Sequence, residues 1–348
     1  QLTYYGTSPS SAAGVCSYNK FQNLVIENVY YPIYTYGTSS YPIIGTEITG
    51  CTIGGETTGD ISYAYGIYLY YLADTSITNN VIRNIGYAGG VSGVYTSTVY
   101  GNLNVTGNRI YGLVNTSTSS TSAVNGIYAS LSTSTAMPNP VVNIYNNMIW
   151  GLVSSYTGTG STSYLVRGIY LGGATAAITY NVDYNSIRIE GPATSMSAGV
   201  YFNANTAVNK LRNNVIVNNT PNQTGSYYHP CVYFNHATTI GAAGSTSDNN
   251  VLFFANNGNG LAVRGSSTNY ATLPAWTTAS GQDANSRPTD PQYDAANPLD
   301  ILTGVPTPVE GRAQVIAGIS TDIYGNLRDA SGPDIGAHEG EFDREESA

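Results

Sequence analysis

The stretch "GIYLGGATAAITYNVDYNSIRIEG", residues 168–191, begins with Gly-Ile-Tyr and passes through an asparagine into an alternation of isoleucine with polar residues. Variants of the opening tripeptide recur at residues 66–68, 93–95, 126–128, 199–201 and 231–233, at intervals of 27 to 42 residues. A recurrence of this length, with strand-like alternation and no helical period, is typical of a solenoid. The chain therefore repeats one structural unit.

Each copy also contains the same polar corner, an asparagine followed two positions later by an aliphatic residue. These asparagines are Asn80, Asn108, Asn147, Asn185, Asn214 and Asn250. Asparagine tolerates the left-handed backbone of a sharp corner, and stacked asparagines can pair their amides along the axis of a solenoid. We expect a structural column of asparagines, each adopting the corner conformation itself.

Each repeat offers three short strands separated by Asn and Gly corners, and only stacking can bury its inward isoleucines and valines. We therefore predict an all-β fold, a right-handed parallel β-helix of roughly nine coils spanning residues 1–265. Residues 266–348 are predicted to form a loop-rich, acidic C-terminal cap of the same domain, with a short helical turn near Trp276.

A column of tyrosines is predicted by the third position of the tripeptide, because the preceding aliphatic residue points inward and alternation directs the tyrosine outward. Its members are Tyr68, Tyr95, Tyr128, Tyr170, Tyr201 and Tyr233. The column could pack under loops, contact other subunits or stack against sugars. A second outward column is predicted three residues after each corner asparagine: Arg83, Tyr111, Trp150, Arg188, Val217 and Phe253.

Charge is scarce and unevenly distributed. Charged residues make up 9% of the 348 residues, and the net charge is −9. The chain through residue 280 carries eight acidic and eight basic residues, so the whole excess lies in the last 68 residues. A neutral body without a basic stripe argues against nucleic-acid binding. No apolar run approaches the roughly 18 residues that a membrane-spanning helix needs.

Catalytic patterns are weak, and we assign no catalytic residue, metal ligand or cofactor. Asp183, Arg212 and Asp248 occupy equivalent positions and predict a column of salt bridges rather than a pair of catalytic carboxylates. His229, His236 and His338 are expected in solvated or loop positions. The carboxylates of Asp283, Asp290, Asp294 and Asp300 are expected to be solvated, with a calcium site as the less favoured alternative. Cys16 and Cys51 are either bridged or, as we favour, free.

The C-terminal segment carries a resemblance to known proteins. Its blocks "TLPAWTTASGQDANS" (272–286), "DPQYD" (290–294) and "TDIYGNLRDASGPDIGAHEG" (321–340) are similar to the end of the β-helix repeat proteins that bacteria secrete by type IX export. The resemblance implies that this segment closes the helix and that the protein is secreted. It implies no chemistry, because the family is mostly made up of surface or secreted proteins without assigned activity.

These observations favour a non-enzymatic structural protein, extracellular or at the cell surface, acting as an adhesin or as the subunit of a filament or matrix. We expect self-association, head-to-tail or lateral, because the N-terminal end of the solenoid has almost no charge to protect its strand edges. The chain begins at Gln1, as expected of a processed or excerpted product. The alternative is a carbohydrate-active β-helix protein, either a polysaccharide lyase or hydrolase or a binder of cell-surface glycans.

Overall fold

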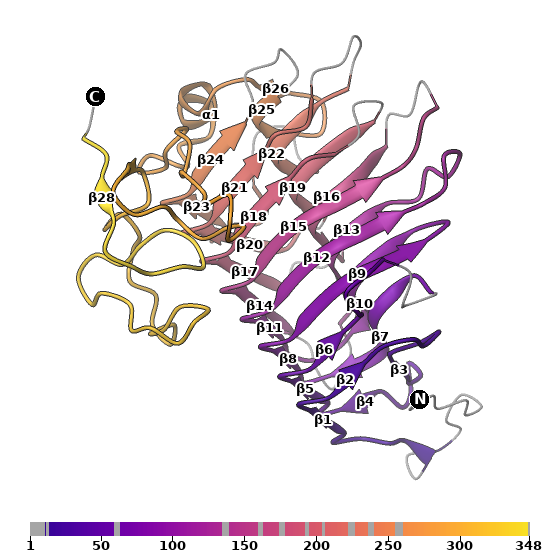
Figure 1. Cartoon of the computed structure of the whole chain (residues 1–348). Coiled ribbons are helices and arrows are strands. Elements are labelled where there is room, and N and C mark those ends of the chain that lie inside the picture. The colour runs from indigo at the N-terminus through magenta and orange to yellow at the C-terminus, as the bar shows by residue number, and fades with distance from the viewer. Residues whose placement is uncertain are drawn as a thin grey trace.

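The computed structural model describes residues 11, 14–58, 63–133, 139–158, 163–173, 178–191, 195–203, 206–221, 227–235, 240–254 and 260–346. It confirms the predicted parallel β-helix. The chain winds through three parallel sheets, one strand of each per coil, and Figure 1 shows the coils stacked from the N-terminal end to the C-terminal end. Eight three-strand coils are described, close to the roughly nine expected.

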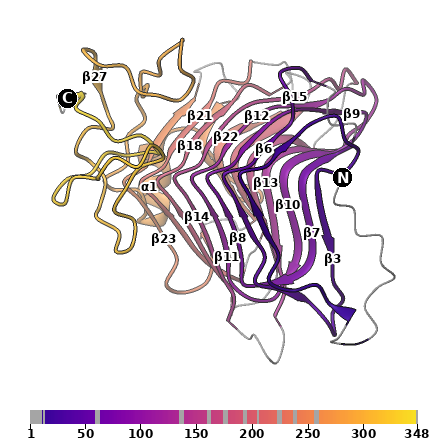
Figure 2. The ribbon, with the colours of Figure 1, turned by 60° about the horizontal axis from the view of Figure 1, so that its bottom comes forward.

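The three sheets run the length of the stack, as seen from a second side in Figure 2. The first sheet contains β1 (Lys20–Gln22), β5 (Glu47–Thr49), β8 (Thr75–Thr78), β11 (Leu103–Thr106), β14 (Val141–Tyr145), β17 (Thr179–Asp183), β20 (Val208–Arg212) and β23 (Thr246–Asp248). The second contains β2 (Val25–Ile26), β6 (Thr52–Ile53), β9 (Val81–Tyr87), β12 (Arg109–Asn115), β15 (Met148–Ser154), β18 (Ser186–Ile189), β21 (Val215–Asn218) and β24 (Val251–Phe254).

The third sheet has the longest strands and ends in an antiparallel pair. It contains β3 (Ile33–Tyr36), β7 (Tyr65–Ala73), β10 (Val91–Val99), β13 (Val124–Leu131), β16 (Tyr164–Gly172), β19 (Met196–Phe202), β22 (His229–Phe234), β25 (Gly260–Arg264) and β26 (Asn269–Tyr270), with β4 (Ile43–Ile44) beside β7. The C-terminal segment adds α1 (Leu273–Ser280), β27 (Pro306–Thr307) and β28 (Asp343–Arg344).

The core is a stack of aliphatic side chains in register. On the first sheet Ile77, Val105, Ile144, Val182 and Leu211 are successive register partners, and all are buried. The same holds on the second sheet for Ile82, Ile110, Ile149, Ile187, Ile216 and Leu252. These are the aliphatic positions that flank the corner asparagines in the sequence. Inward alternation therefore sets the register of both sheets.

The six corner asparagines form a continuous ladder inside the β-helix, between the first and second sheets. The side-chain amides of the first five donate to the Oδ1 atom of the asparagine in the next coil, over 2.9 to 3.1 Å. Each amide also donates to a backbone carbonyl across the core, and every member is 0% exposed. The ladder thus satisfies buried polar groups that would otherwise be costly to enclose.

Both ends of the ladder are closed by other residues. At the N-terminal end, the backbone N–H of Cys51 donates to Asn80 Oδ1 over 2.9 Å. At the C-terminal end, Asn250 donates from Nδ2 to Asp283 over 3.1 Å and from its backbone N–H to Ser286 Oγ over 2.8 Å. The Cys51 thiol is buried, and both Cys51 and Cys16 are free, so no bridge joins them.

The prediction that each ladder asparagine has a left-handed backbone was wrong. The left-handed residue is the one before each ladder asparagine: Asn79, Gly107, Asn146, Tyr184, Asn213 and Asn249, with φ between 53° and 68°. The sharp corner is therefore made first, and the following asparagine turns its side chain inward to the ladder. The left-handed corner and the buried ladder side chain therefore belong to two adjacent residues, although we predicted both for one residue.

The C-terminal end of the core is covered by α1, which confirms the helical turn predicted near Trp276. The helix begins after Thr272, whose Oγ1 accepts from the N–H of Ala275, and ends at Gly281 in a left-handed conformation. Trp276 is buried against Phe234, with 5.9 Å between ring centroids. Its Nε1 donates to Asp283 over 2.8 Å. Trp276, which covers the core, is therefore bonded to Asp283, which closes the ladder.

The rest of the C-terminal segment does more than cap the end. It folds along the side of the coils, where Figure 1 shows its yellow loops beside the stack. Side chains of four left-handed corner residues donate hydrogen bonds to backbone carbonyls of this segment. Asn146 donates to Thr321, and Asn249 donates to Arg312. Tyr184 and Asn213 both donate to Gln314. The corner that turns the chain thus also docks the segment.

Arg328 organises the block at residues 321–340. Its side chain is 3% exposed and donates to Glu339 over 2.9 Å and to Asn146 over 2.8 Å. The guanidinium lies 3.9 Å from the centroid of the Tyr184 ring. Asp334 is also buried there and accepts backbone N–H groups of Gly311 and Gly340. A buried ion pair tied to the corner fixes the segment against the β-helix.

Replacing Asn147 by Val tests the ladder. The change removes the acceptor of two donors from Asn108 and the side-chain amide that donates to the Val105 carbonyl and to Asn185 Oδ1. We expect a loss on the order of 2–4 kcal/mol in the free energy of unfolding, since each buried group left unpaired costs about 1–3 kcal/mol.

Asn143→Val in the same coil is the matched control for Asn147→Val. Asn143 belongs to a half-buried row on the outer face of the first sheet, where it donates to Asn104 over 2.9 Å and accepts from Asn181 over 2.8 Å. Water can replace both bonds, so we expect a loss below about 1 kcal/mol. Equal losses for the two variants in denaturant unfolding would contradict the structural role of the buried ladder.

Candidate functional site

The tyrosine column is the most regular feature of the outer surface. All six predicted tyrosines are register partners on the third sheet, and Tyr34 adds a seventh at the N-terminal end. Successive ring centroids lie 4.3 to 5.3 Å apart, and all six pairs are stacked. The column is therefore continuous from β3 to β22.

The rings are less exposed than the sequence analysis expected. Six of the seven are half-buried and Tyr233 is buried, because each ring covers its neighbours. This partial burial is the main cause that raises the pKa of Tyr68, Tyr128 and Tyr201, and it raises the pKa of the neighbouring Tyr65 to about 12. The phenols remain neutral at ordinary pH and offer hydroxyl groups to solvent or a ligand.

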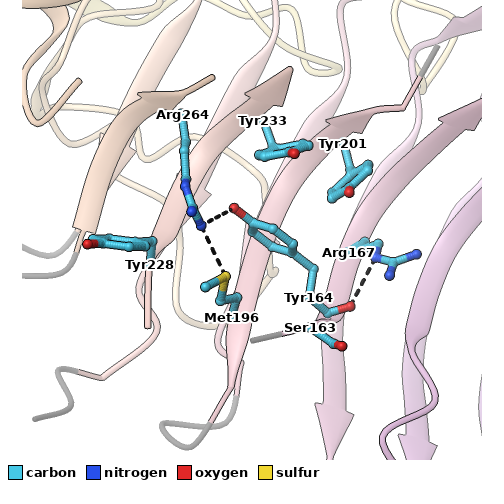
Figure 3. A pocket seen from close by; sticks show the side chains of 8 residues that line it. All are labelled: Ser163, Tyr164, Arg167, Met196, Tyr201, Tyr228, Tyr233 and Arg264. Carbon is cyan, nitrogen blue, oxygen red and sulfur yellow. Dashed lines mark hydrogen bonds between the residues drawn. The ribbon is translucent and has the colours of Figure 1, made fainter. Parts of the chain in front are cut away.

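An arginine occupies the eighth position of the column. Arg264 of β25 is the register partner of Tyr233 and lies at the edge of a groove of about 470 Å³. Figure 3 shows the groove, where the Arg264 side chain points toward the Tyr164 hydroxyl and the Met196 sulfur. Arg264 donates to these two atoms over 2.9 and 3.1 Å, and its guanidinium lies 4.5 Å from the centroid of the Tyr228 ring.

A second arginine lines the same groove. Arg167 of β16 lies 4.9 Å from the centroid of Tyr170 and 5.0 Å from that of Tyr201, and its Nε donates to the Tyr164 carbonyl over 3.0 Å. Burial lowers the pKa of its guanidinium, which stays charged at neutral pH. Among the described residues, no carboxylate lies within 4.0 Å of either arginine.

The second predicted column does not form a continuous exposed surface, because part of it is covered. Tyr111 and Trp150 stack with 4.4 Å between centroids, and Arg83 pairs with Glu56. The C-terminal segment covers this part of the second sheet and packs against Trp150, Val217 and Phe253. Val217 is buried. This covering was not predicted, because the covering residues are distant along the chain and no periodic pattern marks them.

The predicted column of salt bridges is present only in part. Arg212 donates to both carboxylate oxygens of Asp183 over 2.8 Å, and Asp183 is 2% exposed. Asp248 is in register with Arg212 but accepts instead from the backbone N–H and the side chain of Asn285. The two aspartates are thus occupied separately, an arrangement that offers no pair of convergent carboxylates.

His229 corrects our expectation of a solvated histidine, whereas His236 lies outside the described residues. His229 is buried in β22, with Nδ1 3.1 Å from Ser197 Oγ, and burial lowers its pKa to about 4. Ser197 is equally buried and bonded to Asn218 and Thr220. A substrate has no access to this pair, so we assign it a structural role. His338 is half-buried and accepts from the N–H of Ile301.

The four C-terminal aspartates differ from one another. Asp283 is buried, contrary to our expectation of a solvated carboxylate, because it caps the ladder and binds Trp276 and Ser286. Asp290 and Asp294 each accept a backbone N–H two residues later, and Asp300 accepts from the Tyr324 hydroxyl. In the part of the chain that the structure describes, no three His, Cys, Asp or Glu residues are grouped as metal ligands.

Comparisons with known proteins add no identity to this geometry. No protein-family model matches the chain, and no curated protein is significantly similar to it. Among the described residues, no helix is long and apolar enough to cross a membrane. The tyrosine column and its two-arginine groove are therefore the candidate site on geometric grounds.

Alkaline titration tests the half-buried state of the column. The pKa values of Tyr68, Tyr128 and Tyr201 are raised above their unfolded value of about 10, so their contribution to stability is complete below pH 10 and is lost as pH rises further. We expect phenolate absorbance to lag behind that of free tyrosine, and the free energy of unfolding to fall above pH 10.

Tyr128→Phe should keep the ring stack and reduce this alkaline loss of stability. The matched control is Tyr18→Phe, at a tyrosine that is 71% exposed and lies outside the column. If all tyrosines of the native protein titrate together at the value of free tyrosine, the column is not buried as described.

Proposed function

We propose that the protein is a secreted, non-enzymatic structural or adhesive protein that acts outside the cell or at its surface, as the subunit of a filament or matrix. The observation that carries this proposal is the difference between the two ends of the β-helix. One end is covered by the chain itself, and the other presents strand edges and apolar side chains among the described residues.

The covered end is the C-terminal one, where α1 places Trp276 and Leu273 over the last coil. At the N-terminal end β1, β2 and β3 pair with β5, β6 and β7 of the next coil, and no described strand pairs with them on the other side. Val25 of β2 is 71% exposed, and Phe21 and Ile26 are only partly buried against the core. Residues 1–10 and 12–13 lie outside the described residues, so their part in this end stays a prediction.

Open strand edges pair with other strands unless they are protected. A different surface of a second copy can cover this open end, and such a heterologous contact propagates into a filament rather than closing. The tyrosine column, which runs along the side of the rod, offers a surface for lateral contacts between filaments. The resemblance of the C-terminal blocks to proteins of type IX export supports secretion.

The enzymatic alternative has less support. Glycoside hydrolysis uses two carboxylates facing a cleft, and the groove beside the tyrosine column has none among its described lining residues. Binding of glycans without cleavage is favoured by that groove, because aromatic rings and arginines are suited to saccharide recognition. An adhesive role and a structural role are compatible in one surface protein.

Analytical ultracentrifugation and electron microscopy of the full chain test self-association. We expect species larger than the monomer that grow with concentration. Val25→Lys places a charge on the open edge at an exposed position and should shift the protein toward the monomer without lowering its stability. Val315→Lys, at a valine that is 60% exposed elsewhere, is the matched control.

A chain that stays monomeric at all concentrations and forms no fibres would contradict the filament proposal. An equal effect of the two lysine variants would place the contact away from the first coil. A closed dimer sensitive to Val25→Lys would retain the edge as an interface but exclude a filament.

A further inference from the structure

We propose that the groove at the C-terminal end of the tyrosine column binds carboxylated sugar units of an acidic glycan, such as a uronate polymer. The inference rests on the adhesive part of the proposed function and names the ligand class that it would recognise. It is carried by two arginines without an anionic partner, set among tyrosines in the middle of a fully paired sheet.

The charge of the groove is uncompensated within the described chain. Arg264 and Arg167 belong to none of the five ion pairs, whereas the half-buried Arg188 pairs with Glu190 and the half-buried Arg83 with Glu56. The Nε atom of Arg264 is buried and has no hydrogen-bond partner. A buried donor without a partner is costly, and a carboxylate that accepts from the guanidinium fork would relieve that cost.

The position of both arginines is fixed before a ligand binds. Arg264 is held between the Tyr164 hydroxyl, the Met196 sulfur and the Tyr228 ring, and Arg167 lies between two rings of the column. Little side-chain entropy is therefore lost on binding, and the planar fork matches the two oxygens of a carboxylate. A groove of about 470 Å³ falls in the range of small-molecule sites.

The surroundings favour a sugar over a peptide. The groove lies over β16, β19, β22 and β25, and each of these strands is hydrogen-bonded on both sides, so an extended peptide finds no strand edge to join. The phenol hydroxyls of Tyr164, Tyr201 and Tyr233 both donate and accept, which suits a ligand with many hydroxyl groups. Two arginines in a chain of net charge −9 do not suit a nucleic acid.

The acidic C-terminal segment of a second copy is the other candidate occupant. Glu345 accepts from Thr289, and Asp334 and Glu339 are buried at the corner of the β-helix. Glu341, Asp343 and Glu346 are exposed, so the experiment below treats this segment as one of its outcomes.

Titration calorimetry of the full chain with an oligogalacturonate tests the proposal. The methyl ester of the same oligosaccharide keeps its shape and removes its charge, so we expect it to bind at least tenfold more weakly. Arg264→Gln should weaken binding of the acid at least tenfold, and Arg264→Lys should give an intermediate loss because it keeps the charge without the fork. Arg188→Gln, on the second sheet, is the matched control and should change affinity less than twofold.

Thermal unfolding of each variant separates loss of binding from loss of structure. If Arg264→Gln unfolds, Tyr164→Phe, which removes only one hydroxyl from the groove, should still weaken binding of the acid. Equal binding of acid and ester, an equal effect of Arg188→Gln, or no binding of oligogalacturonate, alginate and hyaluronan would each overturn the inference.

The proposed function and this inference fail separately. If no acidic glycan binds but the rods still assemble, the inference is wrong and the structural role stands. If Arg264→Gln abolishes assembly while glycan binding is absent, the occupant is a second copy and the inference is likewise overturned. A monomer that binds acidic glycans would retain the inference and remove the filament.

Discussion

The whole architecture depends on the pairing of buried asparagine amides along the axis of the β-helix. Six of the eight described coils contribute one asparagine each, and its side chain is hydrogen-bonded to the preceding and the following member of the ladder or to the residue that closes its end. A core of isoleucine and valine alone would fix the spacing between coils more strongly than the position of each corner above the next. The ladder fixes the position of the corners, because an amide out of register with its neighbours would be left unpaired in an apolar interior.

The repeat that builds the ladder also determines which side chains lie on the outside of the β-helix. Its asparagines point inward, so the left-handed residue before each of them is free to present its side chain outward. Asn146, Tyr184, Asn213 and Asn249 use this freedom to bind the C-terminal segment. On the third sheet the same register places one tyrosine above the next, and the column ends at Arg264. A single repeat unit thereby builds a core, a docking edge and an outer surface.

Periodic features were predictable from the sequence, and unique contacts were not. The ladder asparagines, the inward aliphatic residues and six tyrosines recur at equivalent positions, so their stacking follows from the fold. The degenerate first copy concealed Tyr34, and nothing periodic marks Tyr164, Arg167 or Arg264 as neighbours. The burial of His229 and Asp283 was missed for a physical reason: each is enclosed by segments that are distant in sequence, and composition carries no information on which loop covers which side chain.

Side-chain hydrogen exchange of asparagine, measured by NMR on protein labelled with nitrogen-15 at asparagine, tests the ladder most directly. Each of the six buried amide groups donates to a core carbonyl and also to the next asparagine, or to Asp283 in the case of Asn250, so exchange requires opening of the coil. The account predicts six asparagine side chains as protected as the backbone of the core, with Asn143 on the outer face exchanging rapidly. Rapid exchange of all asparagine side chains while the backbone stays protected would contradict it.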